Sequence, residues 1–265
     1  MTNDKMIKLA TGNSRKATVW TPCEMLLSEL YTKLSTPIRT AERYSDYMGW
    51  SKAQQDAIKD VGGFVGGELV GSRRKSNAVR LRSLATLDLD RIPADGKDII
   101  LRRVDSLGCG YCVYSTRKHS DAAPRLRVVI PLCRDCTADE YEPLTRKLAE
   151  HIGMECCDPT TFEAARLMYW PSCSADSTYV YTFADRPMLD VDAMLAMYTD
   201  WRDVQEWAGL TAPKLPSGGK QADPTEKSGI VGAFCRVYDV PRAISELLPG
   251  VYIPCGKDRY TYVAG

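Results

Sequence analysis

Two aspartates near the middle of the chain are the first candidates for chemistry. Asp88 and Asp90 lie at the end of the apolar run "SLATLDLDRI", residues 83–92. On a strand, residues two apart face the same side, so both carboxylates share one face while Leu87 and Leu89 pack on the other. Close carboxylates repel each other unless a cation lies between them, and hard oxygen ligands suit Mg²⁺ or Mn²⁺. The alternative is a solvated strand end, because the turn "RIPADG" follows directly.

A second candidate is the polar segment "YSTRKHS", residues 114–120. His119, one of only two histidines in the chain, lies there among hydroxyls and cations. Hydrogen bonds and charge from this segment, and from arginines across the turn, could bind a phosphate group. The side chains in question are Ser115, Thr116, Lys118, His119, Arg125 and Arg127. A solvated basic hairpin tip is the alternative.

The segment "CCDPTTFEAARLMYWPS" supplies a third carboxylate. Asp158 follows an apolar stretch, as a ligand at a strand end would, and Glu163 and Arg166 lie close behind it. The alternative is a capping role for Asp158, since Asp-Pro often opens a turn or a helix. Glu140 is excluded from the site because it occupies the third position of a capping box.

A basic turn, "GSRRKSN", precedes the strand that carries the carboxylate pair. With the arginines just after it, the turn gathers five cations within ten residues: Arg73, Arg74, Lys75, Arg80 and Arg82. Such a cluster could follow a nucleic-acid backbone. A solvated charge run is an equal alternative.

The chain has ten cysteines, and two pairs have CxxC spacing, Cys109/Cys112 and Cys133/Cys136. This spacing is typical of a zinc ribbon. However, the sequence over 111–116 predicts a strand, and residues three apart point to opposite faces of a strand. We therefore expect buried reduced thiols rather than zinc.

Alternating helices and short strands position these residues. Capping boxes predict helix starts at Thr21, Ser51 and Thr137, and a further helix is predicted over 95–108. Strands are predicted over six segments: 62–70, 78–90, 111–116, 125–132, 165–172 and 179–184. Because many strand neighbours are joined by short turns, the pattern favours an α+β fold with a mixed or antiparallel sheet over a doubly wound parallel one.

Composition indicates an ordinary globular protein. The chain has 265 residues, of which 44% are hydrophobic and 26% charged, and its net charge of +1 identifies no partner. No apolar stretch approaches about 18 residues and the N-terminus lacks a signal-peptide core, so we expect a cytoplasmic protein without a membrane partner. The expected organisation is an N-terminal helical part over 1–60, a catalytic core over 61–212, a Pro/Gly/Lys-rich linker over 213–228 and a small C-terminal helical segment over 229–265.

The order of carboxylate pair, Ser/His/basic turn and third carboxylate resembles that of the archaeo-eukaryotic primase superfamily. The stretches "YSTRKHSDAAPRLRVVIPL", "TTFEAARLMYWPS" and "KQADPTEKSGIVGAFCRVYDVPRAI" are similar to the N-terminal primase-polymerase region of phage and mobile-element replication proteins of the virulence-associated protein E type. The resemblance runs from about residue 60 to the C-terminus. It implies an RRM-like catalytic core acting in the cytoplasm of a bacterial host. The chain contains no GxxxxGK[ST] run, so we expect the helicase domain usual in such proteins to follow Gly265 on the full-length polypeptide.

The resemblance also implies a role for each candidate residue. Mg²⁺ or Mn²⁺ in a two-metal site would be held by Asp88, Asp90 and Asp158. The triphosphate of an NTP or dNTP would be bound by His119, Ser115, Lys118 and Arg127. Arg166 would support the triphosphate or orient Asp158. A single-stranded DNA template would be contacted by the basic turn, through Arg73, Arg74, Lys75 and Arg80.

The predicted function is template-directed nucleotidyl transfer by a primase-polymerase. One alternative is a metal-dependent nuclease or replication-initiation endonuclease, although a relaxase-type initiator needs a His-hydrophobic-His pair and His119 and His151 lie far apart in the sequence. The other is a non-catalytic module that binds single-stranded nucleic acid. The sequence leaves open whether ribonucleotides or deoxynucleotides are preferred. It also leaves open whether the protein starts new strands or only extends existing ones.

Overall fold

The chain divides into two compact units, residues 1–210 and 211–265, which are treated separately below. The structure is a computed structural model that describes residues 1–209, 223, 225, 229–256 and 259–263. The first unit contains, in chain order, β1 (Met6–Gly12), β2 (Thr21–Leu26), α1 (Leu27–Ser35), β3 (Ile38–Arg39), α2 (Tyr44–Gly49), α3 (Lys52–Lys59), β4 (Gly63–Val65), β5 (Gly67–Leu69), β6 (Val79–Leu89), α4 (Lys97–Asp105), β7 (Tyr111–Ser115), β8 (Leu126–Cys136), α5 (Ala138–Ile152), β9 (Met168–Tyr169), β10 (Ser172–Cys173), β11 (Tyr181–Ala184) and α6 (Val191–Leu195).

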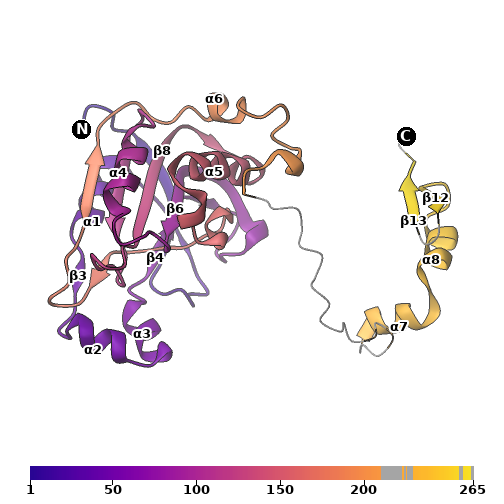
Figure 1. The fold of residues 1–265 in the computed structure, drawn as a ribbon, viewed down its shortest axis with the longest axis horizontal. Helices are drawn as coiled ribbons and strands as arrows, with labels where there is room; N and C mark the ends of the chain where they lie inside the picture. The colour runs from indigo at the N-terminus through magenta and orange to yellow at the C-terminus, as the bar shows by residue number, and fades with distance from the viewer. Residues whose placement is uncertain (210–222, 224, 226–228, 257–258, 264–265) are drawn as a thin grey trace. The chain divides into compact units, whose positions relative to one another are not determined.

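A five-stranded sheet with the order β11-β7-β8-β6-β5 forms the centre of this unit, and its neighbouring strands all pair antiparallel. Strand β8 lies between β6 and β7, and β5 pairs with the other side of β6. Helices α4 and α5 cover one face of the sheet (Figure 1). The fold is therefore α+β, as the turn pattern predicts, and the RRM-like description stays a prediction.

The alternation of β6 separates the two sides of this sheet. Leu87 and Leu89 are buried with the residues of α4 and α5, whereas Leu84 packs into a second cluster with β1 and α1. Side chains an even number of residues apart on a strand point to the same face, so Asp88 points to the same face as Leu84, away from α4 and α5. The predicted split between leucines and carboxylates is confirmed for Leu87, Leu89 and Asp88.

A second antiparallel sheet with the order β2-β1-β4-β9 packs beside the first. The single apolar segment 62–70 supplies both β4 and β5, one to each sheet. Gly63 on β4 faces Tyr169 on β9, and a Cβ at Gly63 would come within 2.2 Å of the Met168 carbonyl oxygen. The close approach that glycine permits here fixes β9, and with it Tyr169, against β4.

Two of the three capping boxes begin helices where the sequence predicts them. Ser51 and Thr137 cap α3 and α5, each with the reciprocal side chain at the third position. The helix predicted to start at Thr21 is wrong, because Thr21–Leu26 is strand β2, which pairs residue by residue with β1, and α1 begins at Leu27. Backbone pairing with β1 outweighs the local capping signal, so the segment 1–60 contributes strands as well as helices.

The two cysteines of the first CxxC pair lie on opposite sides of the sheet. Cys109 packs in the cluster with α4 and α5, and Cys112 packs in the cluster with β1 and α1. Burial raises the pKa of the Cys109 thiol to about 11. This arrangement agrees with the predicted strand geometry and with two protonated, apolar thiols.

The second unit contains α7 (Gly229–Val237), α8 (Val240–Leu247), β12 (Tyr252–Gly256) and β13 (Arg259–Tyr262). The two strands pair antiparallel, so the predicted C-terminal helical segment also contains a hairpin. The predicted linker 213–228 lies outside the described residues except for Asp223 and Thr225. Within the described parts of the chain, no helix is long and apolar enough to cross a membrane.

Candidate active site

The three predicted carboxylates lie around one polar pocket of about 590 Å³ at the end of β6. The chain brings Asp158 there through backbone bonds, because its N–H donates to the Asp88 carbonyl at 2.8 Å and the Asp90 N–H donates to the Cys156 carbonyl at 3.0 Å. The pocket is lined by Arg15, Lys16, Lys52, Asp56, Lys59, Arg74, Asp88, Asp90, Asp158, Glu163, Arg166, Leu167 and Tyr169. Six of these side chains are cationic and five are acidic, so the pocket concentrates both signs of charge in nearly equal number.

Asp88 is the most buried of the three carboxylates, and it faces a buried arginine. The β6–β8 register places Arg127 directly opposite Asp88, and Asp88 Oδ1 lies 3.6 Å from Arg127 Nε. The two side chains are 8% and 4% exposed. Burial by itself lowers the pKa of Arg127, but the charge of Asp88 and the Tyr114 hydroxyl outweigh burial and raise it. Asp88 Oδ1 and Arg127 Nε are both buried atoms without a hydrogen-bond partner among the described residues, so the contact between them is an ion pair and not a hydrogen bond.

Asp90 lies nearer to solvent and pairs with Arg125. Its Oδ2 is 3.2 Å from Arg125 Nη1, and both side chains are 33% exposed. A pair with this exposure exchanges partners at little cost. Asp90 is thus held loosely, whereas Asp88 is held in a buried pair.

Asp158 forms the cap that its sequence context offered as one of two alternatives, and it also lines the pocket. Its Oδ1 accepts from the Thr160 N–H at 2.8 Å and caps a short 3₁₀ turn, Pro159–Phe162. Its Oδ2 lies 3.1 Å from Arg166 Nη2, which in turn is 3.8 Å from Asp88 Oδ2. Burial raises the pKa of Asp158, but the Thr160 hydrogen bonds and Arg166 outweigh it and hold the pKa below its ordinary value. Asp158 is therefore ionised at neutral pH, with one oxygen in the cap and one facing the pocket.

The oxygen donors of the pocket are of the type that a hard divalent cation prefers, because the three predicted carboxylates all line it. Within the described residues, however, no group of three or more acidic, histidine or cysteine side chains is gathered closely enough to hold a metal ion. Each carboxylate is paired with an arginine instead, so a metal ion would take the place of arginine contacts on Asp90 and Asp158.

His119 is buried and is not among the residues that line the pocket. Its Nδ1 accepts from the Arg125 N–H at 3.1 Å, which fixes the proton of the neutral ring on Nε2. Burial, followed by the charge of Lys97, lowers the pKa of His119. Its Nε2 is buried without a hydrogen-bond partner among the described side chains and backbone, so the ring presents an unused N–H donor.

Three other residues predicted to bind the nucleotide also lie outside the pocket lining, namely Ser115, Lys118 and Arg127. Ser115 is buried, and its hydroxyl accepts from the Val180 N–H at 3.0 Å, where the chain enters β11. Burial, followed by the charges of Lys52 and Arg125, lowers the pKa of Lys118. Ser115 thus has a structural contact that accounts for its burial, while Lys118 faces the cations of the site.

The basic turn contributes one side chain to the pocket. Arg74 lines it, donates to the Ala165 carbonyl at 3.0 Å and packs over the ring of Trp20. Arg73 and Lys75 are exposed and are not among the lining residues, and Arg80 pairs with Glu68 at 3.1 Å. Arg82, counted with the cluster in the sequence, is fully buried.

Arg82 therefore cannot track a nucleic-acid backbone. It donates to the Leu84 carbonyl at 3.2 Å and to the Tyr141 hydroxyl at 3.0 Å. It also donates to the Ala164 carbonyl, so its hydrogen bonds connect β6 to the loop that carries Arg166. The sequence interpretation that counted Arg82 in a cluster of five surface cations is therefore wrong for this residue, because Arg82 lies in the core.

Sequence reasoning missed the cations that helix α3 and the β1–β2 loop bring to the pocket. Lys52, Asp56 and Lys59 are spaced four and three apart, which places them on one helical face. Arg15 comes from the β1–β2 loop and pairs with Asp56 at 3.3 Å. The helical spacing was readable from the sequence, but nothing local indicates that this face points at Asp88.

Lys59 is the most perturbed of these cations. Burial, followed by the charge of Arg127, lowers the pKa of its ammonium to about 8. Its Nζ lies 5.0 Å from the centre of the Tyr169 ring. A buried ammonium whose pKa is lowered in this way, and which lies near three carboxylates, indicates a binding role rather than a structural one.

Replacing Lys59 by methionine is expected to stabilise the protein. At pH 7 the change removes a buried charge, and the free energy of unfolding should rise by roughly 1–3 kcal/mol. The unfolded chain keeps the lysine proton up to about pH 10.5 while the folded protein loses it above about pH 8. Wild-type stability therefore rises across that window, and the advantage of the variant shrinks.

Urea unfolding of wild type and Lys59→Met at pH 7 and pH 10 measures both effects. Lys52→Met is the matched control, because Lys52 is exposed and pairs with Asp56. Equal destabilisation by both variants at pH 7 would contradict the assignment of a strained charge to Lys59.

A family model described as the VapE N-terminal domain matches residues 1–210, which coincides with the first compact unit. A solved structure of the AEP domain of the cyanophage S-2L primase-polymerase is similar over 72% of this chain and 87% of that chain, with 12% identity and a TM-score of 0.37. No match was found among curated proteins. The family match begins at residue 1 rather than near residue 60, and it ends before the stretch over 220–244 that entered the sequence resemblance.

Proposed function

We propose that this chain, which belongs to the family described as the VapE N-terminal domain, is a metal-dependent nucleotidyltransferase of the primase-polymerase type. The observation that carries the proposal is the meeting of Asp88, Asp90 and Asp158 at one pocket whose remaining walls are largely cationic. Acids that bind metal ions, next to cations that bind a polyphosphate, are what transfer of a nucleotide requires.

In the proposed reaction, the 3′-hydroxyl oxygen of a DNA or RNA primer bonds to the α-phosphorus of a nucleoside triphosphate. The bond from that phosphorus to the oxygen bridging to the β-phosphate breaks, pyrophosphate leaves, and the hydroxyl proton passes to solvent. Asp88, Asp90 and Asp158 would hold Mg²⁺ or Mn²⁺, whose charge lowers the pKa of the attacking hydroxyl and neutralises the leaving phosphates.

The arginines of the site divide by their exposure. Arg125 and Arg166 are 33% and 26% exposed and pair with Asp90 and Asp158. Their guanidinium groups bind phosphate oxygens as well as carboxylates, so both arginines can transfer from the acids to the triphosphate. Arg127 is 4% exposed and stays with Asp88. Lys59, Lys52 and Arg15 add charge for the β- and γ-phosphates.

His119 would bind the nucleotide through its free Nε2–H. The Arg125 N–H fixes the tautomer, and the lowered pKa keeps the ring neutral. In this state the ring donates one hydrogen bond to a phosphate oxygen. Ser115 and Lys118 remain proposed triphosphate contacts; like His119, neither lines the pocket.

Replacing His119 by asparagine tests this role. The amide oxygen of asparagine can still accept from the Arg125 N–H, so the variant removes the Nε2–H donor and little else. The KM for the nucleotide is expected to rise roughly tenfold, the value of one hydrogen bond to a charged group, with a smaller change in kcat. His151→Asn, at the exposed second histidine on α5, is the control; an unchanged KM in His119→Asn would remove His119 from the nucleotide site.

A synthesis assay tests the proposed function directly. The protein is incubated with single-stranded DNA, with and without a primer, in Mg²⁺ or Mn²⁺, with NTPs or dNTPs. Labelled product longer than the input strand, dependent on metal, supports the proposal. Shortening of labelled DNA without added nucleotide would identify a nuclease, and binding without either change would identify a non-catalytic module.

A further inference from the structure

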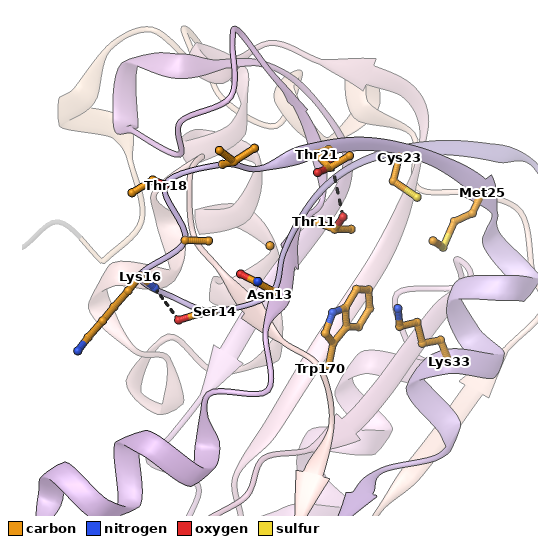
Figure 2. A pocket seen from close by; sticks show the side chains of 13 residues that line it. Thr11, Asn13, Ser14, Lys16, Thr18, Thr21, Cys23, Met25, Lys33 and Trp170 are labelled. Carbon is orange, nitrogen blue, oxygen red and sulfur yellow. Dashed lines mark hydrogen bonds between the residues drawn. The ribbon is translucent and has the colours of Figure 1, made fainter.

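A second, larger cavity of about 840 Å³ adjoins the acidic pocket. Its walls come from the β1–β2 hairpin, helix α1 and the residue that follows β9 (Figure 2). Its lining contains two lysines, Lys16 and Lys33, and no acidic residue. The cavity thus attracts an anionic ligand without the help of a metal ion, unlike the acidic pocket beside it.

One wall of this cavity is the ring of Trp170. Phe64 packs against the ring, with the centroids 4.9 Å apart and the planes 31° from parallel. The Lys33 ammonium lies 3.8 Å from the ring centroid, and Figure 2 shows its side chain facing the indole beneath the hairpin. Lys33 is exposed, and the contact with this ring is the one interaction of its ammonium among the described residues, so the ammonium can leave the aromatic surface at little cost.

The two cavities share a lining residue. Lys16 lines both of them. The consecutive residues Tyr169 and Trp170 each line one, Tyr169 the acidic pocket and Trp170 the second cavity. Consecutive residues of an extended segment point to opposite sides, so Tyr169 and Trp170 face different cavities, and Lys16 is the lining residue through which a ligand could contact both.

We propose that this second cavity binds the single-stranded DNA template next to the acidic pocket, with one base stacked on Trp170 in place of the Lys33 ammonium. The displaced Lys33 and the shared Lys16 then contact the flanking phosphates. An aromatic surface, free cations and small polar side chains are the elements that bind single strands without sequence preference. Thr11, Asn13 and Thr21 supply the polar groups here. The proposal rests on the proposed function for the identity of the strand as a template.

Photo-crosslinking locates the strand without relying on activity. A single-stranded oligonucleotide containing 5-iododeoxyuridine is bound to the full chain, irradiated and digested, and the crosslinked peptide is identified by mass spectrometry. We expect the crosslink on Trp170. An RNA strand of the same sequence is tested in parallel, because stacking on an aromatic ring is open to either kind of strand; preferential crosslinking of RNA would overturn the choice of DNA.

Binding measurements test the lysines. Lys33→Ala and Lys16→Ala are each expected to weaken binding of the oligonucleotide several-fold and to lower the slope of log Kd against log salt by about 0.7. Trp170→Leu keeps an apolar partner for Phe64 and removes the stacking surface, with an expected loss of roughly tenfold. Lys147→Ala is the control, because Lys147 lies on α5 and pairs with Glu150.

The outcomes separate this inference from the proposed function. Template-dependent synthesis by the wild type together with crosslinks elsewhere, and with wild-type affinity in Lys33→Ala, would overturn the template site and leave the nucleotidyltransferase standing. A crosslink on Trp170 and weakened binding in Lys33→Ala, without synthesis by the wild type, would support a single-strand site and overturn the reaction.

Discussion

Replacing Asp90 by asparagine is expected to reduce nucleotide incorporation by roughly 10²–10³-fold or more while the protein stays folded. The loss follows from removing one of the acids proposed to hold the metal ions, a group that acts on charge developing in the transition state. The fold should tolerate the change because Asp90 and Arg125 form a half-exposed pair, 33% exposed on each side, whose contribution to stability is under about 1 kcal/mol.

Incorporation of a labelled nucleotide, measured at saturating Mg²⁺ and again at saturating Mn²⁺, tests this expectation. Asp139→Asn is the matched control: Asp139 follows β8 on the first turn of α5, at the end of the sheet opposite Asp90. The register establishes this separation, since Arg82 pairs with Cys136 and Asp88 with Arg127. Incorporation by Asp90→Asn within a factor of three of the control would remove Asp90 from the active site.

The second large effect concerns stability. Replacing Arg127 by methionine is expected to lower the free energy of unfolding by roughly 3–5 kcal/mol, because it leaves the Asp88 carboxylate buried without a counter-charge. Asp88 and Arg127 are 8% and 4% exposed and lie directly opposite each other on β6 and β8. Arg127 is further enclosed by the rings of Tyr114 and Tyr169, at 5.8 and 5.6 Å from their centroids.

Urea unfolding measures this loss, and two further variants locate its cause. Arg125→Met removes the neighbouring, half-exposed arginine and should cost less than about 1 kcal/mol. The double variant Asp88→Asn/Arg127→Met should recover at least about 1 kcal/mol relative to Arg127→Met, since the unpaired charge is gone. Equal losses in Arg125→Met and Arg127→Met, or no recovery in the double variant, would show that the buried pair is not the reason.

The Asp88–Arg127 pair also affects how a loss of activity in Asp88 variants is interpreted. Asp88 is the ion-pair partner of a buried arginine. Replacing it by alanine therefore removes a proposed metal ligand and, at the same time, leaves the buried charge of Arg127 without a counter-charge, which destabilises the fold. Loss of activity in that variant would therefore mix catalysis with unfolding. Asp90 carries the cleaner test of the reaction, although the sequence alone treats the two aspartates as equivalent.

The sequence by itself determined the features that depend on neighbours along the chain. Alternation on β6 separates Asp88 from Leu87 and Leu89, and reciprocal hydrogen bonds start α3 at Ser51 and α5 at Thr137. Strand period and capping chemistry involve residues at most four apart, so they are readable without knowing the fold. The order of the acidic and basic motifs indicated the family through resemblance.

Tertiary structure alone decided which distant residues meet. Thr21 carries a helix-capping pattern yet lies in β2, because β1 offers a complete set of backbone partners. Arg82 resembles its exposed neighbours in sequence, but it is buried and donates to the Tyr141 hydroxyl and the Ala164 carbonyl of two other segments. Asp158 reaches Asp88 through a single backbone hydrogen bond across the sheet end, and Lys59 reaches them from a separate helix. These placements depend on pairing and packing between segments far apart in the chain. A local pattern of residue types carries no information about such contacts.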